Sequence, residues 1–348
     1  MGKDMQTKIL IILLCFFLFF GNTSAQVHQQ AQPHVSTNLI AYENIIHEGI
    51  ECVQKEMNNH SDSQEYLNEL EAWFNHHPLI TFATRIGTSM TLKFIDDVYI
   101  ILMDLDLFIL QPAVVTDSFH SFIDERYGSG NHKAVLLNAA EFMYGHRQCK
   151  KIIATLLRLD YSIEYIANHA VDLHYMKNNL SVDIVYMNTH AGFFDVDGDH
   201  EADSVVIATG EYWTNETEET YAFDYENKFI VKGMVGDQAF IALTPAFIEY
   251  YYSEAGLPSS LVFMATCYAS YDSSMAEQFL QVGAAVYMGW SQNTVFWTNS
   301  RTSVTAFHLL SYGLSVQQVC RLIRSGGFYN WLLHSKLTYY GDGTYRLP

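Results

Sequence analysis

The sequence predicts an α/β protein with a mostly parallel sheet, helices on both sheet faces, and a small α+β unit in front. Three observations support this. From about residue 131, apolar strand-like runs alternate with amphipathic helical patterns, as in βαβ units. Residues 26–130 lack that alternation. Two apolar runs also end abruptly in residues able to do chemistry, His190 and Cys267.

The first 25 residues have the pattern of a secretory signal peptide. Lys3 and Lys8 precede an apolar run over 9–20, and small residues follow over 22–25. That run is shorter than the roughly 20 residues that a membrane-spanning helix needs. We therefore expect a mature chain from Gln26 and a secreted or extracytoplasmic, cell-surface location. An uncleaved anchor is the alternative.

Charge and composition exclude some classes of partner. The formal net charge is −19, and removal of two lysines and one aspartate with residues 1–25 makes it −20. Such a chain, with no long basic stretch, is not expected to bind nucleic acid. No later apolar run approaches about 18 residues, so no membrane span is expected after signal removal.

The cysteines are too few for a disulfide-built scaffold of this length. The mature chain would keep Cys52, Cys149, Cys267 and Cys320. Cys149 and Cys320 lie on the apolar faces of predicted helices, which favours buried thiols at both positions.

Residues 26–130 form the predicted N-terminal α+β unit. Helical spacing predicts a hairpin of helices over 42–56 and 63–74, with a turn at 58–62. Strands over 79–86, 90–95 and 98–103 are expected to pair antiparallel. The glycine-rich stretch 128–131 is the expected boundary, and the unit is a candidate prodomain.

Residues 131–348 form the second predicted domain. Strands over 134–140 and 161–167, helices around 149–157 and 171–176, and a strand ending at His190 make a βαβαβ unit. The stretch 193–243 interrupts this order as a β-rich insertion that would cover the site. The alternation then resumes through the strand before Cys267.

His190 and Cys267 are expected to form a thiol–imidazole dyad. The carboxyl ends of neighbouring parallel strands meet at one sheet edge, where open α/β sheets hold their sites. A cysteine becomes a strong nucleophile as the thiolate, which a nearby imidazolium favours. Taken singly, Cys267 could instead be a small core residue and His190 a hydrogen-bonded loop histidine.

Four stretches also carry a family resemblance: Thr189–Gly192, Ala265–Ser270, 276–290 and 339–347. Together they resemble the gingipain-type branch of the caspase-like cysteine peptidases, over about residues 131–348. The resemblance implies a caspase-like fold and a cysteine-type endopeptidase, a hydrolase. Cys267 would be the nucleophile that forms an acyl-enzyme and His190 the catalytic histidine. The amides of Cys267, Ala191 and Gly192 would hold the oxyanion.

The same resemblance implies a substrate pocket at the ends of the first strand and of the strand after the nucleophile. Glu141 would favour a Lys or Arg side chain there, and Trp290 would form a wall. Each has an alternative: a solvated loop carboxylate for Glu141 and a core aromatic side chain for Trp290.

An acidic loop follows the predicted histidine. Asp195, Asp197, Asp199 and Asp203 occupy relative positions 1, 3, 5 and 9, an oxygen spacing typical of Ca²⁺ loops. A structural Ca²⁺ is therefore expected, which would fix the loop that carries His190, and no organic cofactor is expected. An acidic solvated turn is the alternative. Zinc is less well supported because no HExxH or paired CxxC is present.

Two functions remain open from the sequence. The first is a secreted cysteine endopeptidase that acts on protein or peptide substrates, with a preference for basic residues before the cleaved bond. The alternative is a catalytically inactive caspase-like binding or scaffold module at the cell surface. The inactive module is favoured by Ala191, where the family usually has Gly, and by Thr266, Ala269 and Ser270 around the cysteine.

Overall fold

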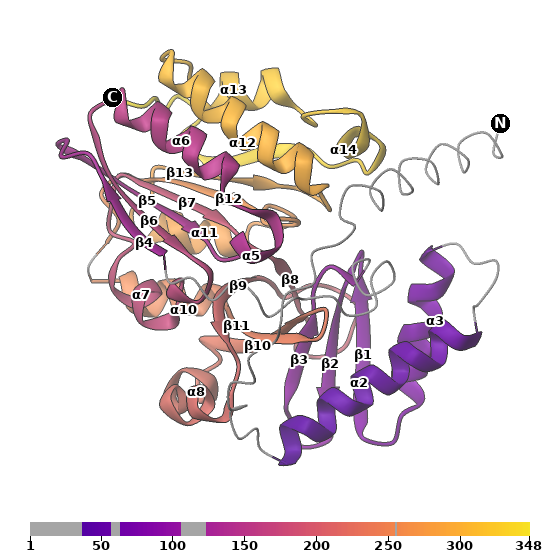
Figure 1. The fold of residues 1–348 in the computed structure, drawn as a ribbon. Coiled ribbons are helices and arrows are strands. Elements are labelled where there is room, and N and C mark those ends of the chain that lie inside the picture. Colours follow the sequence, from indigo (N-terminus) through magenta and orange to yellow (C-terminus); the bar gives the residue numbers. More distant parts are fainter. Residues whose placement is uncertain (1–36, 57–62, 106–122, 255) are drawn as a thin grey trace, which may run out of the picture. The chain divides into compact units, whose positions relative to one another are not determined.

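The computed structural model describes residues 37–56, 63–105, 123–254 and 256–348, and shows a mixed α/β protein with two sheets, named sheet A and sheet B (Figure 1). The predicted signal peptide, the turn at 58–62 and the expected start at Gln26 lie outside these residues. In the described part of the chain, no helix combines the length and apolar character needed to cross a membrane.

Sheet B has the order β14-β13-β12-β7-β5-β6-β4. The five central strands are parallel, and the two edge strands are antiparallel to their neighbours. Parallel pairing of β5 with β6 and β7 confirms the predicted βαβαβ unit. The bounds are β4 Ile123–Tyr127, β5 His132–Asn138, β6 Tyr161–Ala167, β7 Ile184–Asn188, β12 Leu261–Ala265, β13 Val286–Trp290 and β14 Leu337–Gly341.

Both faces of sheet B are buried, as expected for a parallel sheet. Along β5, Ala134 and Leu136 enter one hydrophobic cluster, while Val135 and Leu137 enter another. Helices cover both faces (Figure 1). One face carries α6 Arg147–Leu157, α12 Phe296–Ser311 and α13 Val316–Ile323; the other carries α7 Leu173–Asn178, α10 Pro245–Tyr252 and α11 Ser274–Gln281.

Sheet A has the order β1-β2-β3-β10-β11-β9-β8. The antiparallel pairing of β1, β2 and β3 is confirmed. β10 then pairs parallel with β3, through Lys232 opposite Ile100. The bounds are β1 Ile80–Ile86, β2 Ser89–Phe94, β3 Tyr99–Leu102, β8 Ala191–Phe194, β9 Ser204–Tyr212, β10 Ile230–Val235 and β11 Gln238–Leu243.

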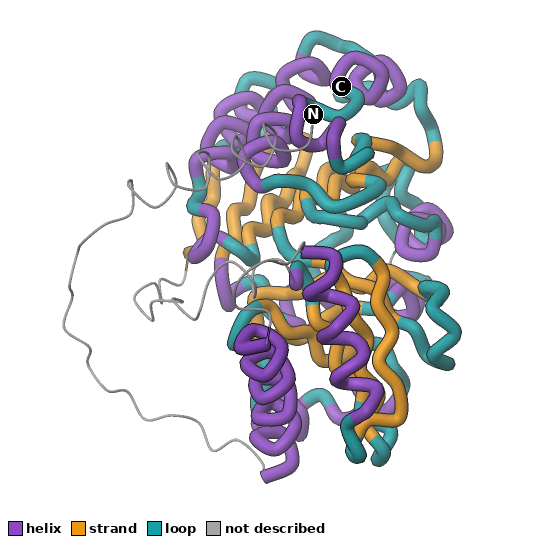
Figure 2. The backbone as a smooth tube through the Cα atoms, turned by 90° about the vertical axis from the view of Figure 1, so that its right-hand side faces the viewer, coloured by secondary structure: helices purple, strands orange, loops and turns teal. Residues whose placement is uncertain are grey.

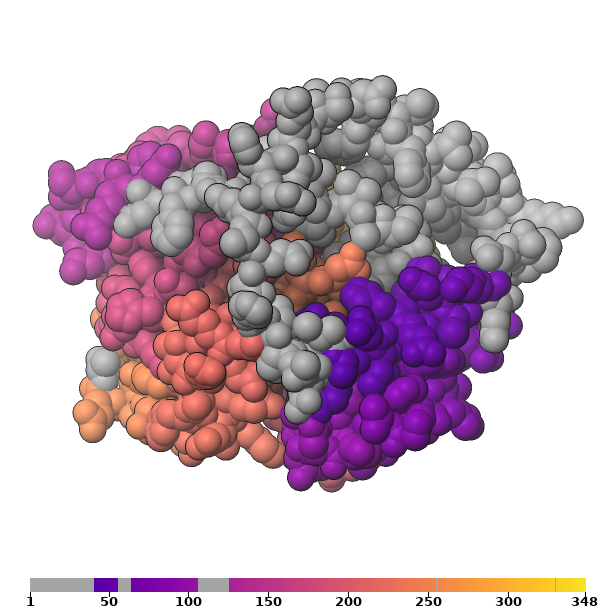
Figure 3. Space-filling view, turned by 60° about the horizontal axis from the view of Figure 1, so that its bottom comes forward, coloured from indigo at the N-terminus to yellow at the C-terminus, as the bar shows by residue number. Residues whose placement is uncertain are grey.

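The predicted N-terminal unit and the predicted insertion 193–243 therefore contribute strands to one sheet. Their surfaces adjoin in Figure 3, where the early residues are indigo to purple and the later ones salmon. The predicted boundary at 128–131 is the turn between β4 and β5, both of them strands of sheet B.

Two N-terminal helices, α2 Thr37–Glu56 and α3 Ser63–His76, pack on sheet A and confirm the predicted helix pair. Figure 2 shows helices outside both groups of strands. The remaining short helices are α5 Glu141–Tyr144, η1 Asn168–Ala170, α8 Asn215–Thr220, α9 Ala222–Glu226 and α14 Phe328–Leu332. Cys149 and Cys320 are buried free thiols, as predicted.

Candidate active site

The register of sheet B brings the two predicted reactive residues to one edge. Asn188 of β7 pairs with Asn138 of β5 on one side and with Ala265 of β12 on the other. His190 and Cys267 each follow this row by two residues. The row is fixed by a buried hydrogen bond of 2.7 Å from Asn188 Nδ2 to Asn138 Oδ1. Both side chains thus emerge at the carboxyl end of the parallel strands.

A buried carboxylate, Asp104, contacts the histidine. Its Oδ2 lies 2.5 Å from His190 Nδ1, and the side chains are 8% and 4% exposed. An ionised carboxylate only accepts hydrogen bonds, so Nδ1 donates its proton to Asp104. The neutral imidazole then carries no proton on Nε2. Nε2 is buried and has no hydrogen-bond partner among the described residues, so it can receive a proton.

The sulfur of Cys267 contacts the segment that follows β13. The Cys267 residue is 9% exposed, and its thiol donates to Asn293 Oδ1 at 3.0 Å. The backbone N–H of Thr294 donates to the sulfur at 3.3 Å. A donor aimed at sulfur favours the thiolate, so the Thr294 amide is suited to activating a nucleophile.

Polar contacts connect the cysteine to the carboxylate. Asn293 Nδ2 donates to Thr88 Oγ1 at 3.4 Å, in the turn between β1 and β2. The Thr88 carbonyl in turn accepts from the Leu105 N–H at 2.7 Å. Leu105 directly follows Asp104. The β1–β2 turn therefore lies between the cysteine loop and the carboxylate that holds the histidine.

Aromatic contacts connect the cysteine loop to the histidine from another side. The ring of Tyr144, at the end of α5, lies 5.5 Å from the ring of His190. Tyr144 also stacks on Phe296, with ring centroids 4.3 Å apart and planes 14° apart. Phe296 is two residues beyond Thr294. Both sets of contacts connect the loop that holds the Cys267 sulfur with the surroundings of His190.

The predicted oxyanion residues Ala191 and Gly192 begin β8. Gly192 is needed for space, because a Cβ there would lie 2.7 Å from Ser89 Oγ and 2.9 Å from Ile101 Cγ2. The Ala191 methyl is buried in the hydrophobic core.

Backbone pairing directs the N–H groups of Ala191 and Gly192 to opposite sides of β8. The Ala208 N–H donates to the His190 carbonyl, and Gly192 lies opposite Val206. Alternation in an antiparallel ladder then directs the Gly192 N–H toward β9 and the Ala191 N–H away from it. Of the two, Ala191 has the amide that is free of the β8–β9 ladder.

Glu141 is buried rather than solvated, with 8% exposure. Its two carboxylate oxygens contact His146 Nδ1 at 3.0 Å and Asn168 Nδ2 at 3.1 Å. Glu141 begins α5, the helix that ends at Tyr144 beside His190. The buried carboxylate thus lies one helical turn before Tyr144, whose ring is 5.5 Å from that of His190.

Trp290 is a core aromatic side chain. It is completely buried in the hydrophobic cluster beneath α12, and its Nε1 donates to Asn299 Oδ1 at 2.8 Å. Asn299 Nδ2 in turn donates to the carbonyl of Ala265, two residues before the cysteine. Trp290 thus has the alternative place expected for it, in the core, and none of its surface reaches solvent.

The acidic loop after β8 brings three of the four predicted metal ligands together. One carboxylate oxygen from each of Asp195, Asp197 and Asp203 lies within 4.8 Å of the others, and Asp199 is outside this group. No other such cluster of possible metal ligands occurs in the described ranges.

Backbone amides also stabilise this loop. Asp195, which is 1% exposed, accepts hydrogen bonds from the N–H groups of Gly198 at 2.6 Å and His200 at 3.2 Å. The four residues of β8 separate Asp195 from His190. An ion bound here would brace the far end of β8 rather than touch the histidine.

Asp104 is the site residue that sequence reasoning missed. Like His190 and Cys267, it closely follows an apolar strand, β3. This shared position, just after an apolar strand, is a sequence signal that could identify Asp104 as a candidate site residue. The signal is hidden because the sequence predicts a separate unit over residues 26–130.

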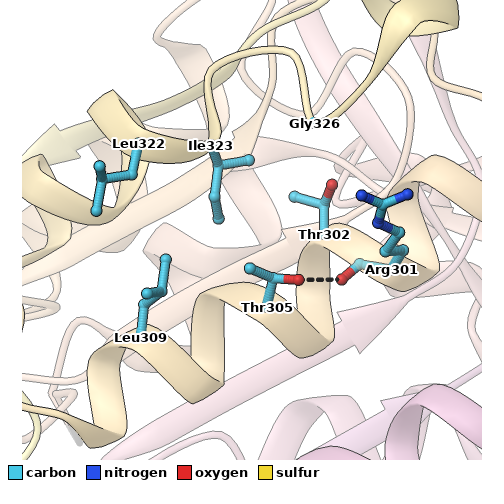
Figure 4. A pocket seen from close by; sticks show the side chains of 7 residues that line it. All are labelled: Arg301, Thr302, Thr305, Leu309, Leu322, Ile323 and Gly326. Atoms are coloured by element: carbon cyan, nitrogen blue, oxygen red, sulfur yellow. Dashed lines mark hydrogen bonds between the residues drawn. The ribbon is translucent and has the colours of Figure 1, made fainter.

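A cavity of about 220 Å³ lies between α12 and α13 (Figure 4). Its lining residues are Arg301, Thr302, Thr305, Leu309, Leu322, Ile323 and Gly326. It contains none of the residues discussed above, so it is separate from the candidate site.

The family resemblance has no independent support, since no protein-family model matches this chain and no curated protein sequence matches it.

Proposed function

We propose that the protein is a cysteine-type endopeptidase of caspase-like type that uses Asp104, His190 and Cys267. The observation that carries this proposal is the buried 2.5 Å contact between Asp104 and His190 Nδ1, beside an Nε2 that has no hydrogen-bond partner among the described residues. Cys267 lies at the same sheet edge, with an amide donor aimed at its sulfur. These are the parts that nucleophilic catalysis needs: a base, a group that orients the base, and a thiol.

The reaction follows from these positions. The Cys267 proton passes to His190 Nε2, and the thiolate attacks the carbonyl carbon of the peptide bond, forming a C–S bond. The imidazolium returns the proton to the leaving amine as the C–N bond breaks. A water molecule then hydrolyses the thioester and restores the thiol. Asp104 holds the imidazole tautomer and stabilises the positive charge that develops.

Negative charge develops on the carbonyl oxygen during attack. We assign its stabilisation to the backbone N–H groups of Cys267 and Ala191. The Gly192 amide has a smaller role because it is directed into the β8–β9 ladder. A methyl group at position 191 is compatible with this role because it packs in the core.

Glu141 supports a preference for a Lys or Arg side chain before the cleaved bond. Its buried carboxylate lies in α5, the helix that ends beside His190, and a carboxylate favours a cationic ligand. The acidic trio supports a structural Ca²⁺. The secreted location rests on the sequence of residues 1–25 alone.

A thiol-reactive peptidyl probe tests the proposal. We expect the wild type to be labelled at Cys267 and Cys267→Ala to remain unlabelled. Cys52→Ala is the matched control and should label like the wild type, because Cys52 lies in α2. Equal labelling of the wild type and Cys267→Ala would refute the peptidase. A folded wild type that is not labelled would favour the inactive module.

A further inference from the structure

We propose that Asn293 is a positioning residue that controls the protonation of Cys267 by turning its side-chain amide. This inference rests on the proposed role of Cys267 as the nucleophile. Asn293 follows β13, is half-buried, and faces the sulfur with its carbonyl oxygen.

The amide as observed fits the neutral thiol. The S–H group donates to Asn293 Oδ1 at 3.0 Å. A thiol that donates its proton there does not donate it to His190, which agrees with a buried Nε2 that has no partner among the described residues. This arrangement fits a resting state with the proton on sulfur.

The thiolate requires the opposite orientation. After the proton moves to His190 Nε2, an amide oxygen 3.0 Å from the sulfur would face a negative charge. Rotation of the amide by about 180° replaces that oxygen with the Nδ2 donor. The Thr294 N–H, at 3.3 Å, donates to sulfur in both states and need not move.

Thr88 allows this rotation with little loss of hydrogen bonding. In the resting state its hydroxyl accepts from Asn293 Nδ2 at 3.4 Å. A hydroxyl can also donate, so after rotation Thr88 Oγ1 can donate to Asn293 Oδ1. The Tyr268 hydroxyl, 3.3 Å from Thr88 Oγ1, can take either role in turn. The side-chain groups of Asn293, Thr88 and Tyr268 therefore each keep a partner in both states.

The rotation favours the thiolate overall. A thiol is a weak donor, so the resting contact contributes little. A hydrogen bond from an amide to an ionised sulfur is charge-assisted and about twice as strong as a neutral one. Removing the amide should therefore raise the pH at which Cys267 ionises.

The test is the pH dependence of iodoacetamide alkylation, followed by mass spectrometry of the peptide that contains Cys267. At pH 7, Asn293→Ala should react roughly three- to tenfold more slowly than the wild type, from the loss of one charge-assisted donor. Asn293→Asp should react at least about tenfold more slowly, because a carboxylate beside sulfur disfavours a second negative charge. Asn227→Asp, on the exposed surface, is the matched control and should behave as wild type.

Thr88 provides a second pair of variants that leaves the amide in place. Thr88→Val should shift the alkylation profile in the same direction as Asn293→Ala, and Thr88→Ser should restore it. Profiles of Asn293→Ala and Asn293→Asp that overlay the wild type, or faster alkylation in Asn293→Ala, would overturn the inference.

Failure of this inference can be told apart from failure of the peptidase proposal. Iodoacetamide needs no substrate-binding site, so the thiol titration is measurable even if no peptidyl probe reacts. Probe labelling with unchanged profiles in the Asn293 variants would overturn the role of Asn293 alone. Shifted profiles without probe labelling would overturn the peptidase alone.

Discussion

Replacing Asp104 by Asn tests the least expected residue of the site. The substitution keeps the size and shape of the side chain and removes its charge. It also suits the backbone, because Asp104 has a φ of 50° and Asn tolerates this left-handed region. The fold should therefore persist while the electrostatic support of His190 is lost.

The magnitude follows from the contact. Two unit charges 2.5 Å apart interact by about 7 kcal/mol at an effective dielectric constant near 20. Asn keeps one hydrogen bond to the ring. It also avoids the free-energy cost of burying a charged carboxylate, which offsets part of the lost attraction. We expect a net loss of about 2–4 kcal/mol of transition-state stabilisation, which is about a 30- to 1,000-fold slower reaction.

The assay is the second-order rate of labelling by the peptidyl probe, measured beside the melting temperature. Asp97→Asn is a matched control, because Asp97 also has a positive φ of 64° but its side chain is 83% exposed and pairs with Lys93. Labelling of Asp104→Asn within about threefold of the wild type, with an unchanged melting temperature, would refute a role for Asp104 in catalysis.

Three further predictions concern the surroundings of the site. Ca²⁺ at 100 times its dissociation constant should stabilise the wild type by about 2.7 kcal/mol and leave Asp195→Asn unchanged; a melting temperature indifferent to both Ca²⁺ and chelator would argue against the ion. In a peptide-library profile, Glu141→Gln should lose any preference for Lys or Arg before the cleaved bond; a wild type without that preference would exclude the assigned role. Burial raises the pKa of Tyr225 and Tyr345 to about 12. Each neutral phenol thus stabilises the fold fully below pH 10, and this contribution is lost as the pH rises from 10 to 12. Tyr225→Phe should flatten the fall of melting temperature over that range, whereas identical curves would contradict the buried-phenol explanation.

Sequence patterns predicted the strands and the helical connections, because these depend on residues that are close together in the chain. The apolar runs before His190 and Cys267 form β7 and β12, because both faces of these strands are buried. The parallel order of β5, β6 and β7 follows from their helical connections.

Contacts between distant segments were not predictable in the same way. Pairing of β3 with β10 joins Ile100 to Lys232, and no local pattern specifies such a partner. Lys232 itself looks like a surface residue in sequence but is 1% exposed, with Glu43 of α2 at 3.3 Å from its Nζ. Glu141 likewise looks solvated until Asn168, 27 residues later, meets its carboxylate.

The position of Asp104 limits how this protein can mature. The sequence predicts residues 26–130 as a candidate prodomain, a segment that processing would remove. Yet that segment supplies the carboxylate on His190, the Thr88 hydroxyl beside Asn293, and three strands of sheet A. Under the proposed function, a fragment of residues 131–348 would keep the nucleophile Cys267 and lose Asp104, the group proposed to orient His190. Proteolysis after residue 105 would then be compatible with the proposed activity only if the severed N-terminal segment stays bound through the pairing of β3 with β10.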